Sequence, residues 1–452
     1  MKTLAARLSG FARRLRFSSL PPKTVHELKR RVIDSFGCAL AAVKAPPVNA
    51  ARAFARFETG RPSATVLWSR RRTTPELACF VNGTMIRYLD FNDTYLSKEP
   101  AHPSDNLAPA LALAEALGRS GKEFLTALLI GYEVQCRLCD AASLRVRGWD
   151  HVTYGAFSSA LTAGKLLNLS QDQLVHALGL AGVANVALRQ TRVGELSHWK
   201  ACAFANAARN GVFAARLAAA GMTGPSDIFE GEKGFWKLVS GKFRLAALGG
   251  GPRPFMIDKT YIKYFPVEYH AQSAVDAALR VRHKIGDPAW IQSVTVDTFD
   301  VAVEIIGNER EKWRPAHRET ADHSLPYCVA ATLLDGVMGL AQFNRRKIRS
   351  PRLRNLIQKV RVRADARLNR GYPAFLPNRV TVRTKDGRTV AEEVWAPRGH
   401  AKNPMTDGEV EAKFKSLARE RLSPRQTNGI LEKLWELEKV SDMRSFLTNL
   451  VR

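Results

Sequence analysis

The stretch KACAFANAARNGVFAARLAAA, Lys200–Ala220, indicates the fold most directly. Alanine has the highest helix propensity, and its small side chain lets neighbouring helices approach closely. A capping box, Ser170 followed by Gln173, begins another predicted helix. Apolar residues at helical spacing complete the set of predicted helices, which covers 25–42, 106–117, 121–142, 153–167 and 170–187. We interpret this part of the chain as one large all-helical domain.

The sequence pattern changes near residue 255. Short segments there alternate valine with polar side chains, which is typical of half-buried strands. The pair Asp386-Gly387 lies between two such segments and predicts a β-hairpin. The predicted strands cover 291–303, 359–364, 379–384 and 389–394, and helices are predicted over 273–283 and 324–339. This combination indicates a smaller α+β unit.

A chain of 452 residues exceeds what one hydrophobic core usually supports, so we expect more than one domain. We predict a mainly α fold with a helical domain over 1–257 and an α+β lid domain over 258–398. Residues 399–452 are expected to form a helical tail that returns to the helical domain. Residues 1–26 lack acidic side chains, as transit peptides do, but their apolar spacing favours a first helix of the folded chain.

Composition and cysteine content limit the location and partners. No apolar run approaches the roughly 20 residues of a membrane span, so we expect no membrane partner. The six cysteines are sparse and follow no secretory signal, which favours the reducing cytoplasm over a disulfide framework. Cys136 and Cys139 have the spacing of zinc and redox sites. They lie in a predicted helix and lack a second ligand pair, so we expect buried structural thiols, no metal and no cofactor.

The formal net charge of +27 is unusual. Basic residues are concentrated between Arg345 and Arg363, without the interleaved aromatic side chains that stack on nucleic-acid bases. We therefore expect a solvated basic face and regard a nucleic-acid partner as unfavoured. An interaction patch is the alternative interpretation.

Clusters of polar residues lie at the predicted junctions of loops and helices. Each has a structural interpretation, as a helix cap, a loop or domain packing, beside a functional one. Arg189, Arg192 and Lys200 suit the binding of carboxylates, and histidines nearby suit general acid–base chemistry. The clusters cover 88–106, 148–155, 189–200, 261–270 and 323–327. Taken together they predict a cationic pocket for a small polycarboxylate.

Four motifs in this order resemble the MmgE/PrpD family, which includes 2-methylcitrate dehydratase and cis-aconitate decarboxylase. The likeness runs from about residue 5 to residue 440. The motifs are LDFNDT at 89–94 with HPSDN at 102–106, GWDH at 148–151, SHWK at 197–200 and KYFPVEYH at 263–270.

The resemblance implies a homodimer whose active site lies between the domains and needs no iron–sulfur cluster. It implies a lyase that removes water from a hydroxy-tricarboxylate such as 2-methylcitrate, as in propionate catabolism. The catalytic residues that it implies are Asp90, His102, His151, Lys200 and Tyr327. Thr94 and Lys263 are implied to bind substrate, and we add Arg192 and His270 to them from the clusters above.

Two further interpretations stay open. Decarboxylase-like members carry a histidine five residues after the lysine of the Lys-x-Phe-Pro motif, where this chain has Glu268, so dehydration is favoured. An isomerase, epimerase or decarboxylase is the alternative within the family. A non-catalytic basic binding or scaffold protein is the alternative of another class.

Overall fold

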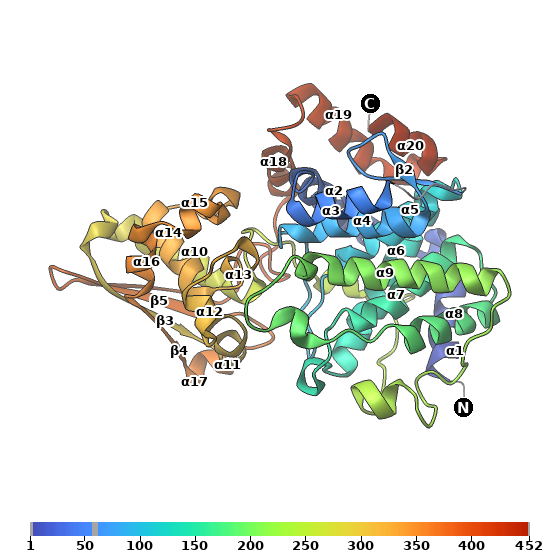
Figure 1. Cartoon of the computed structure of the whole chain (residues 1–452), viewed down its shortest axis with the longest axis horizontal. Coiled ribbons are helices and arrows are strands. Elements are labelled where there is room, and N and C mark those ends of the chain that lie inside the picture. The colour runs from blue at the N-terminus through green and yellow to red at the C-terminus, as the bar shows by residue number, and fades with distance from the viewer. Residues whose placement is uncertain (1–2, 57–61, 451–452) are drawn as a thin grey trace.

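The computed structural model describes residues 3–56 and 62–450 of the chain. The outermost residues of the predicted ranges 1–257 and 399–452 therefore lie outside the described residues. The described chain forms a large helical body and a smaller part in which helices cover a sheet (Figure 1). This confirms the predicted fold class, mainly α with a smaller α+β part. No helix within the described residues is long and apolar enough to cross a membrane.

The helical body begins at the N-terminus and follows the predicted helices closely. The capping boxes of Ser120 with Glu123 and Ser170 with Gln173 are both formed, and the second confirms the sequence prediction. Its helices are α1 (Leu4–Arg14), α2 (Pro22–Ala41), α3 (Pro46–Ala55), α4 (Pro75–Tyr88), α5 (Leu107–Ala116), α6 (Gly121–Ala141), α7 (Thr153–Leu166), α8 (Gln171–Ala184) and α9 (Trp199–Ala219). Short strands β1 (Ala64–Thr65) and β2 (Arg72–Thr73) pair beside them.

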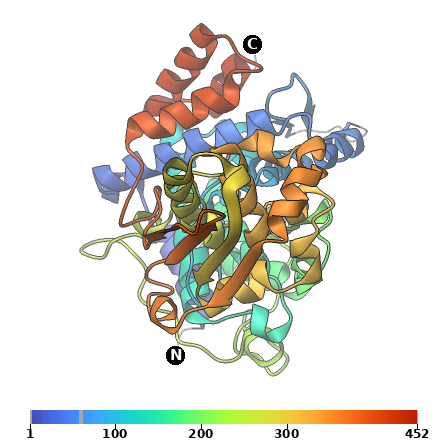
Figure 2. The ribbon, with the colours of Figure 1, turned by 90° about the vertical axis from the view of Figure 1, so that its left-hand side faces the viewer.

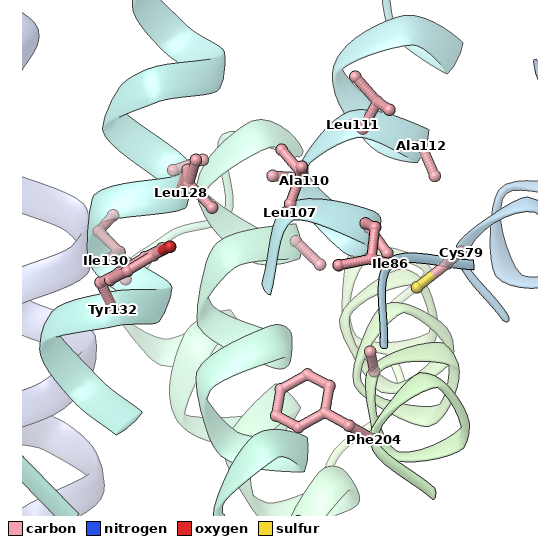
Figure 3. Packing of buried hydrophobic residues seen from close by; sticks show 14 of the residues in the cluster. Cys79, Ile86, Leu107, Ala110, Leu111, Ala112, Leu128, Ile130, Tyr132 and Phe204 are labelled. Atoms are coloured by element: carbon pink, nitrogen blue, oxygen red, sulfur yellow. The ribbon is translucent and has the colours of Figure 1, made fainter. Parts of the chain in front are cut away.

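Small residues let the central helices pack closely, as the alanine-rich stretch predicts. A Cβ on Gly211 of α9 would lie 2.8 Å from the backbone nitrogen of Ala160 in α7. Around this contact the core is filled by larger side chains from neighbouring helices, among them Ile86, Leu107 and Phe204 (Figure 3). Cys136 and Cys139 are buried on α6, as expected for structural thiols.

One stretch of the predicted all-helical domain is not helical. Residues 221–255 form turns and irregular backbone with a single π-helical turn, η5 (Trp236–Ser240). The run Gly249-Gly250-Gly251-Pro252 explains the difference, because glycine and proline disfavour helix interiors. Short 3₁₀ turns occur elsewhere at η1 (Phe17–Ser19), η2 (Pro103–Asn106), η3 (Arg145–Arg147), η4 (Arg189–Arg192) and η6 (Met256–Lys259).

The lid is built on a four-stranded sheet in the order β4-β3-β5-β6. Val294 and Val296 of the central strand face valines on both neighbouring strands, and α10 and α14 pack on the sheet. The lid with its sheet faces the viewer in Figure 2. The predicted hairpin is present, with Gly387 in the left-handed region at φ 87°. The strands are β3 (Ile291–Thr298), β4 (Val360–Ala364), β5 (Asn378–Thr384) and β6 (Thr389–Val394).

The other lid elements are short helices that connect the strands. They are η7 (Tyr269–Ala271), α10 (Gln272–Ile285), η8 (Pro288–Trp290), α11 (Asp300–Ala302), η9 (Val303–Gly307), α12 (Arg310–Trp313), α13 (Arg318–Ala321), α14 (Leu325–Asp335), η10 (Leu340–Phe343), α15 (Arg345–Ile348), α16 (Pro351–Ile357) and α17 (Ala366–Asn369). Helix α14 ends four residues before the prediction, because Gly336 adopts the left-handed conformation that terminates helices.

The C-terminal tail lies against the first helices of the chain (Figure 1). Helices α18 and α19 pack on α2, and α20 packs on α5. The tail elements are α18 (Asp407–Ala418), α19 (Pro424–Trp435), η11 (Leu437–Lys439) and α20 (Met443–Leu450). Their apolar residues belong to the same core as those of α1 to α9, whereas the lid has a core of its own.

The close packing of α7 and α9 can be tested with alanine. Gly211→Ala places a methyl group against backbone, and we expect it to destabilise the protein by roughly 1–3 kcal/mol. Gly429 in α19 is a matched control, because a Cβ there has no atom within 4 Å. Gly429→Ala is expected to stabilise by about 0.5–1 kcal/mol through helix propensity. Urea unfolding followed by circular dichroism measures both, and equal effects would contradict the packing argument.

Candidate active site

Where the helical body meets the lid, charged side chains from distant parts of the chain form a buried network. Asp90 follows α4, His102 precedes η2, His151 precedes α7 and Lys200 lies in the first turn of α9. They meet Lys263, from the segment between η6 and η7, and a pair of lid residues between α13 and α14. All of these side chains are buried.

Asp90 joins the two parts of the molecule. Its carboxylate pairs with Arg87, lies 3.0 Å from Lys263 Nζ and is 3.5 Å from Nδ1 of His323 in the lid. Burial by itself raises the pKa of Asp90, but the charges of Arg87 and Lys263 hold that pKa well below its ordinary value. The backbone of Asp90 is left-handed at φ 50°, an uncommon conformation that costs free energy and is frequent at functional sites.

Lys200 makes the second contact between body and lid. Its Nζ lies 2.6 Å from Asp322 Oδ1 and 3.1 Å from His323 Nδ1. Burial and the charge of Lys200 lower the pKa of His323 to about 4, so His323 is neutral near pH 7. The lid side of the network therefore places charged groups around a neutral His323.

His102 is held in one tautomer by its two neighbours. Its Nδ1 is 2.8 Å from the Asp93 carbonyl, which only accepts hydrogen bonds, so Nδ1 carries the proton. Its Nε2 is 2.8 Å from Nη2 of Arg87, which only donates, so Nε2 accepts. Burial and the Arg87 charge hold the pKa of His102 well below its ordinary value.

His151 differs from His102 because one of its nitrogens has no partner. Its Nδ1 lies 2.8 Å from Asp150 Oδ1, and Arg192 Nε donates to the other oxygen of Asp150 at 3.0 Å. Burial raises the pKa of Asp150, but the charges of Arg192 and His151 lower it below its ordinary value. The Nε2 of His151 is buried and has no hydrogen-bond partner among the described residues. An Asp–His pair of this kind leaves the Nε2 lone pair ready to accept a proton.

Comparison with known proteins identifies the family of the chain. Residues 6–247 match the MmgE/PrpD N-terminal domain and residues 265–437 match the MmgE/PrpD C-terminal domain. The chain belongs to the MmgE/PrpD family. The boundary between the two matched segments, residues 248–264, contains Lys263 and leads into the lid.

Similar members of the MmgE/PrpD family are enzymes. A 2-methylcitrate dehydratase of Cupriavidus necator is 31% identical, over 88% of this chain and 87% of its own length. A 2-methylcitrate dehydratase of Escherichia coli (strain K12) is 29% identical, over 89% and 87%. A cis-aconitate decarboxylase of Homo sapiens is 28% identical, over 97% and 92%. Dehydratases and decarboxylases are both lyases, and this chain is an enzyme of the same lyase type.

Several predicted residues come together in the buried network, and others lie apart. Asp90, His102, His151, Lys200, Lys263 and Arg192 are linked in the network, with Arg192 also donating to the Lys200 carbonyl at 3.3 Å. Thr94 lies beside it and donates to the Ala101 carbonyl. His270 pairs with Glu268 at 2.8 Å.

Tyr327, predicted to be catalytic, lies in the lid core and not in the charged network. It belongs to the hydrophobic core of the lid, where its hydroxyl donates to the Gln342 carbonyl and its ring packs against Phe343. No contact joins it to the charged network in the described part of the chain. The first turn of α14 directs this side chain inward, which the sequence motif by itself does not show.

Sequence reasoning did not select Arg87 or Asp322, and it named His323 only as part of the polar cluster 323–327. Arg87 lies three residues before Asp90, a spacing that brings side chains together on a helix, and this is the one local signal. Asp322 and His323 directly precede the predicted start of a helix. Their contact with Asp90 and Lys200 joins residues more than 100 positions apart and has no signal in a single sequence.

Three of these side chains have the composition of a metal site. Ligand atoms of Asp90, Asp322 and His323 lie within 4.8 Å of one another. Both carboxylates are already paired with cations, Asp90 with Arg87 and Lys263, and Asp322 with Lys200. A divalent cation at this position would meet those positive charges at close range, so the set does not suit a metal ion.

The buried neutral His323 predicts sensitivity to acid. In the unfolded chain a histidine gains its proton near pH 6.5, whereas folded His323 resists protonation until about pH 4. Its contribution to stability is therefore complete above pH 6.5 and is lost as the pH falls from 6.5 to 4, by roughly 3 kcal/mol.

Urea unfolding midpoints measured across this pH range test the expectation. His323→Gln should flatten the dependence between pH 6.5 and 4. The same substitution at the exposed His283 should leave it unchanged. An unaltered slope in His323→Gln would contradict the assignment.

Proposed function

We propose that this enzyme is a hydro-lyase similar to 2-methylcitrate dehydratase. It removes water from a small hydroxy-tricarboxylate by general acid–base chemistry. The observation that carries the proposal is the unpartnered Nε2 of His151, whose Nδ1 is backed by Asp150, which in turn pairs with Arg192. The relatives named 2-methylcitrate dehydratase support the same substrate class. A role in propionate catabolism is part of the proposal and rests on the family resemblance of the sequence motifs.

The proposed elimination begins at His151. Its Nε2 takes the proton from the carbon next to a substrate carboxylate, and Asp150 stabilises the imidazolium that forms. The electron pair of the broken C–H bond forms the new double bond while the C–O bond breaks. Lys200 and Arg87 stabilise the negative charge that develops on the carboxylate.

The departing hydroxyl needs a proton to leave as water. Burial lowers the pKa of Lys263, which makes its ammonium a better acid than an exposed lysine. We assign it this proton, because two of its hydrogens face Asp90 and the third is available. His102 does not suit this role, since its proton lies on Nδ1 against the Asp93 carbonyl.

An iron–sulfur cluster plays no part in this proposal. Such clusters are bound by cysteine thiolates. The six cysteines of this chain are buried in the cores of the two parts, and none belongs to the network described above. Free buried thiols also suit the reducing cytoplasm that we propose as the location.

Substrate entry requires the lid to move in this proposal. The side chains of Lys200 and Lys263 are 2% and 0% exposed. Oδ1 of Asp322 in the lid lies 2.6 Å from Lys200 Nζ, in the position that the proposal gives to a substrate carboxylate. An opened lid removes Asp322 and leaves Lys200 free to bind the substrate.

A decarboxylase is the second candidate within the family, supported by the human cis-aconitate decarboxylase. Glu268 disfavours it. Burial raises the pKa of this carboxyl, but His270 lowers it to about 2, so a negative charge faces Lys263 and His323. Decarboxylase-like members carry a histidine at this position instead, so the acidic Glu268 favours dehydration.

A direct assay separates these possibilities. The purified enzyme is expected to generate the ultraviolet absorbance of an unsaturated product from 2-methylcitrate, without release of carbon dioxide. Asp150→Asn should lower kcat by about 10²- to 10⁴-fold, because the histidine loses the partner that fixes its tautomer. Asp172→Asn, at an exposed position in the first turn of α8, is the control and should be fully active.

No turnover of 2-methylcitrate, citrate or cis-aconitate would remove the dehydratase proposal. Carbon dioxide release would favour the decarboxylase instead. Salt-dependent binding of nucleic acid, with no thermal shift from tricarboxylates, would favour the non-catalytic basic binding protein.

We also propose a homodimer. Apolar side chains are exposed beside the loops that carry Arg192 and Lys200, including Val183, Leu188 and Trp199 at 60%, 62% and 46% exposure. Large exposed apolar side chains grouped on one face are typical of protein–protein contacts. The self-association of this face buries them.

Light scattering coupled to size-exclusion chromatography tests the dimer. Leu188→Asp is expected to convert the enzyme to a monomer by placing a charge in the interface. Val337→Asp, on an exposed lid position, is the matched control and should not change the mass. A monomeric wild-type enzyme would contradict the proposal.

A further inference from the structure

We propose that Lys413, on the tail helix α18, is a positioning residue for the active site. The inference concerns the site described above and rests on its proposed function. Lys413 lies outside the network, and its side chain reaches from the tail to the two backbone segments that carry Asp90 and Lys263.

The ammonium of Lys413 has three hydrogens and three acceptors within hydrogen-bond distance. Its Nζ lies 2.6 Å from Asp34 Oδ1 in α2, 2.6 Å from the Phe91 carbonyl and 2.8 Å from the Lys263 carbonyl. It also lies 3.7 Å from the centre of the Phe91 ring. The side chain of Lys413 is 6% exposed and that of Asp34 is fully buried. Water therefore does not replace these contacts.

The two carbonyls belong to the segments whose alignment sets the central ion pair. Phe91 directly follows Asp90, and Lys263 is the residue whose Nζ binds the Asp90 carboxylate and carbonyl. The same segments pair once more, through reciprocal 2.8 Å hydrogen bonds between Thr94 and Tyr261. Lys413 binds the carbonyls of Phe91 and Lys263 and so holds the two segments together beside the Thr94–Tyr261 hydrogen bonds.

The contacts of α2 reinforce this arrangement. Arg31 of α2 donates to the side chain and carbonyl of Thr260, just before the paired segment. Arg30 of α2 binds the carbonyl of Met405, at the entry to the tail. Both segments that connect the lid to the rest of the protein are therefore anchored to one helix, and Lys413 links them to the site.

Stability alone does not account for the buried Asp34–Lys413 pair. A buried ion pair contributes little net stability, because the desolvation of both charges offsets their attraction. Burial raises the pKa of Asp34, and Lys413 opposes that rise. What an apolar residue could not supply is the pair of hydrogen bonds to the carbonyls of Phe91 and Lys263. The strained backbone of Asp90 needs such support from its surroundings.

The test compares Lys413→Met with Lys415→Met. Lys415 lies on the same helix, half exposed, and pairs only with Glu411 one turn away. We expect Lys413→Met to lower kcat by about 10- to 100-fold, as misplacement of a binding group does. It should also accelerate hydrogen–deuterium exchange at the Thr94 and Tyr261 amides. Lys415→Met should change neither quantity.

A double variant separates positioning from charge balance. Lys413→Met leaves Asp34 as an unpaired buried charge, so a loss of folding stability accompanies it. Asp34→Asn/Lys413→Met removes both charges and should recover the thermal midpoint. Its kcat should stay low and its amide exchange fast, since the Phe91 and Lys263 carbonyls still lack their donor.

Each outcome decides the proposal. Wild-type exchange at Thr94 and Tyr261 in Lys413→Met would overturn it, and so would full recovery of kcat in the double variant. The exchange measurement needs no substrate. If the wild-type enzyme turns over none of the tricarboxylates, the proposed function fails while the positioning role is still tested.

Discussion

The buried carboxylate of Asp90 is the interaction on which the rest of the site depends. An ionised carboxylate removed from water is costly unless cations and hydrogen-bond donors surround it. Arg87 from the same turn, Lys263 from the segment entering the lid and His323 from the lid itself provide that environment. The ion pairs of Asp90 therefore connect the helical body to the lid.

The buried cations around Asp90 and Asp322 also lower the pKa values of two histidines. His102 and His323 have lowered pKa values because they are buried beside Arg87 and Lys200. The His151 ring lies next to His102, with 5.9 Å between ring centres, but its nearest partner is the Asp150 carboxylate. The two neighbouring histidines thus differ in their chemistry. His102 is hydrogen-bonded to the cation Arg87, and His151 is paired with the anion Asp150.

The scaffold keeps these groups in place with rigid elements on every side. The central helices pack closely through glycine and alanine, which leaves little freedom to the loops at their ends. The tail returns to α2 and contacts both backbone segments at the centre of the site. The proposed opening lies between body and lid, where the ion pair of Lys200 with Asp322 is the contact that a substrate carboxylate replaces in the proposal.

The sequence by itself determined the features that depend on neighbouring residues. Helical spacing, the Ser170 capping box and the Asp386-Gly387 hairpin are local, and the structure confirms each of them. The motifs also placed Asp90, His102, His151, Lys200 and Lys263 in one site, because a family resemblance carries information that spacing lacks. Only the tertiary structure decided the direction of Tyr327, the partners Arg87, Asp322 and His323, and the reach of Lys413 from the tail. Those facts depend on which distant charges are desolvated together, and that follows from packing in three dimensions.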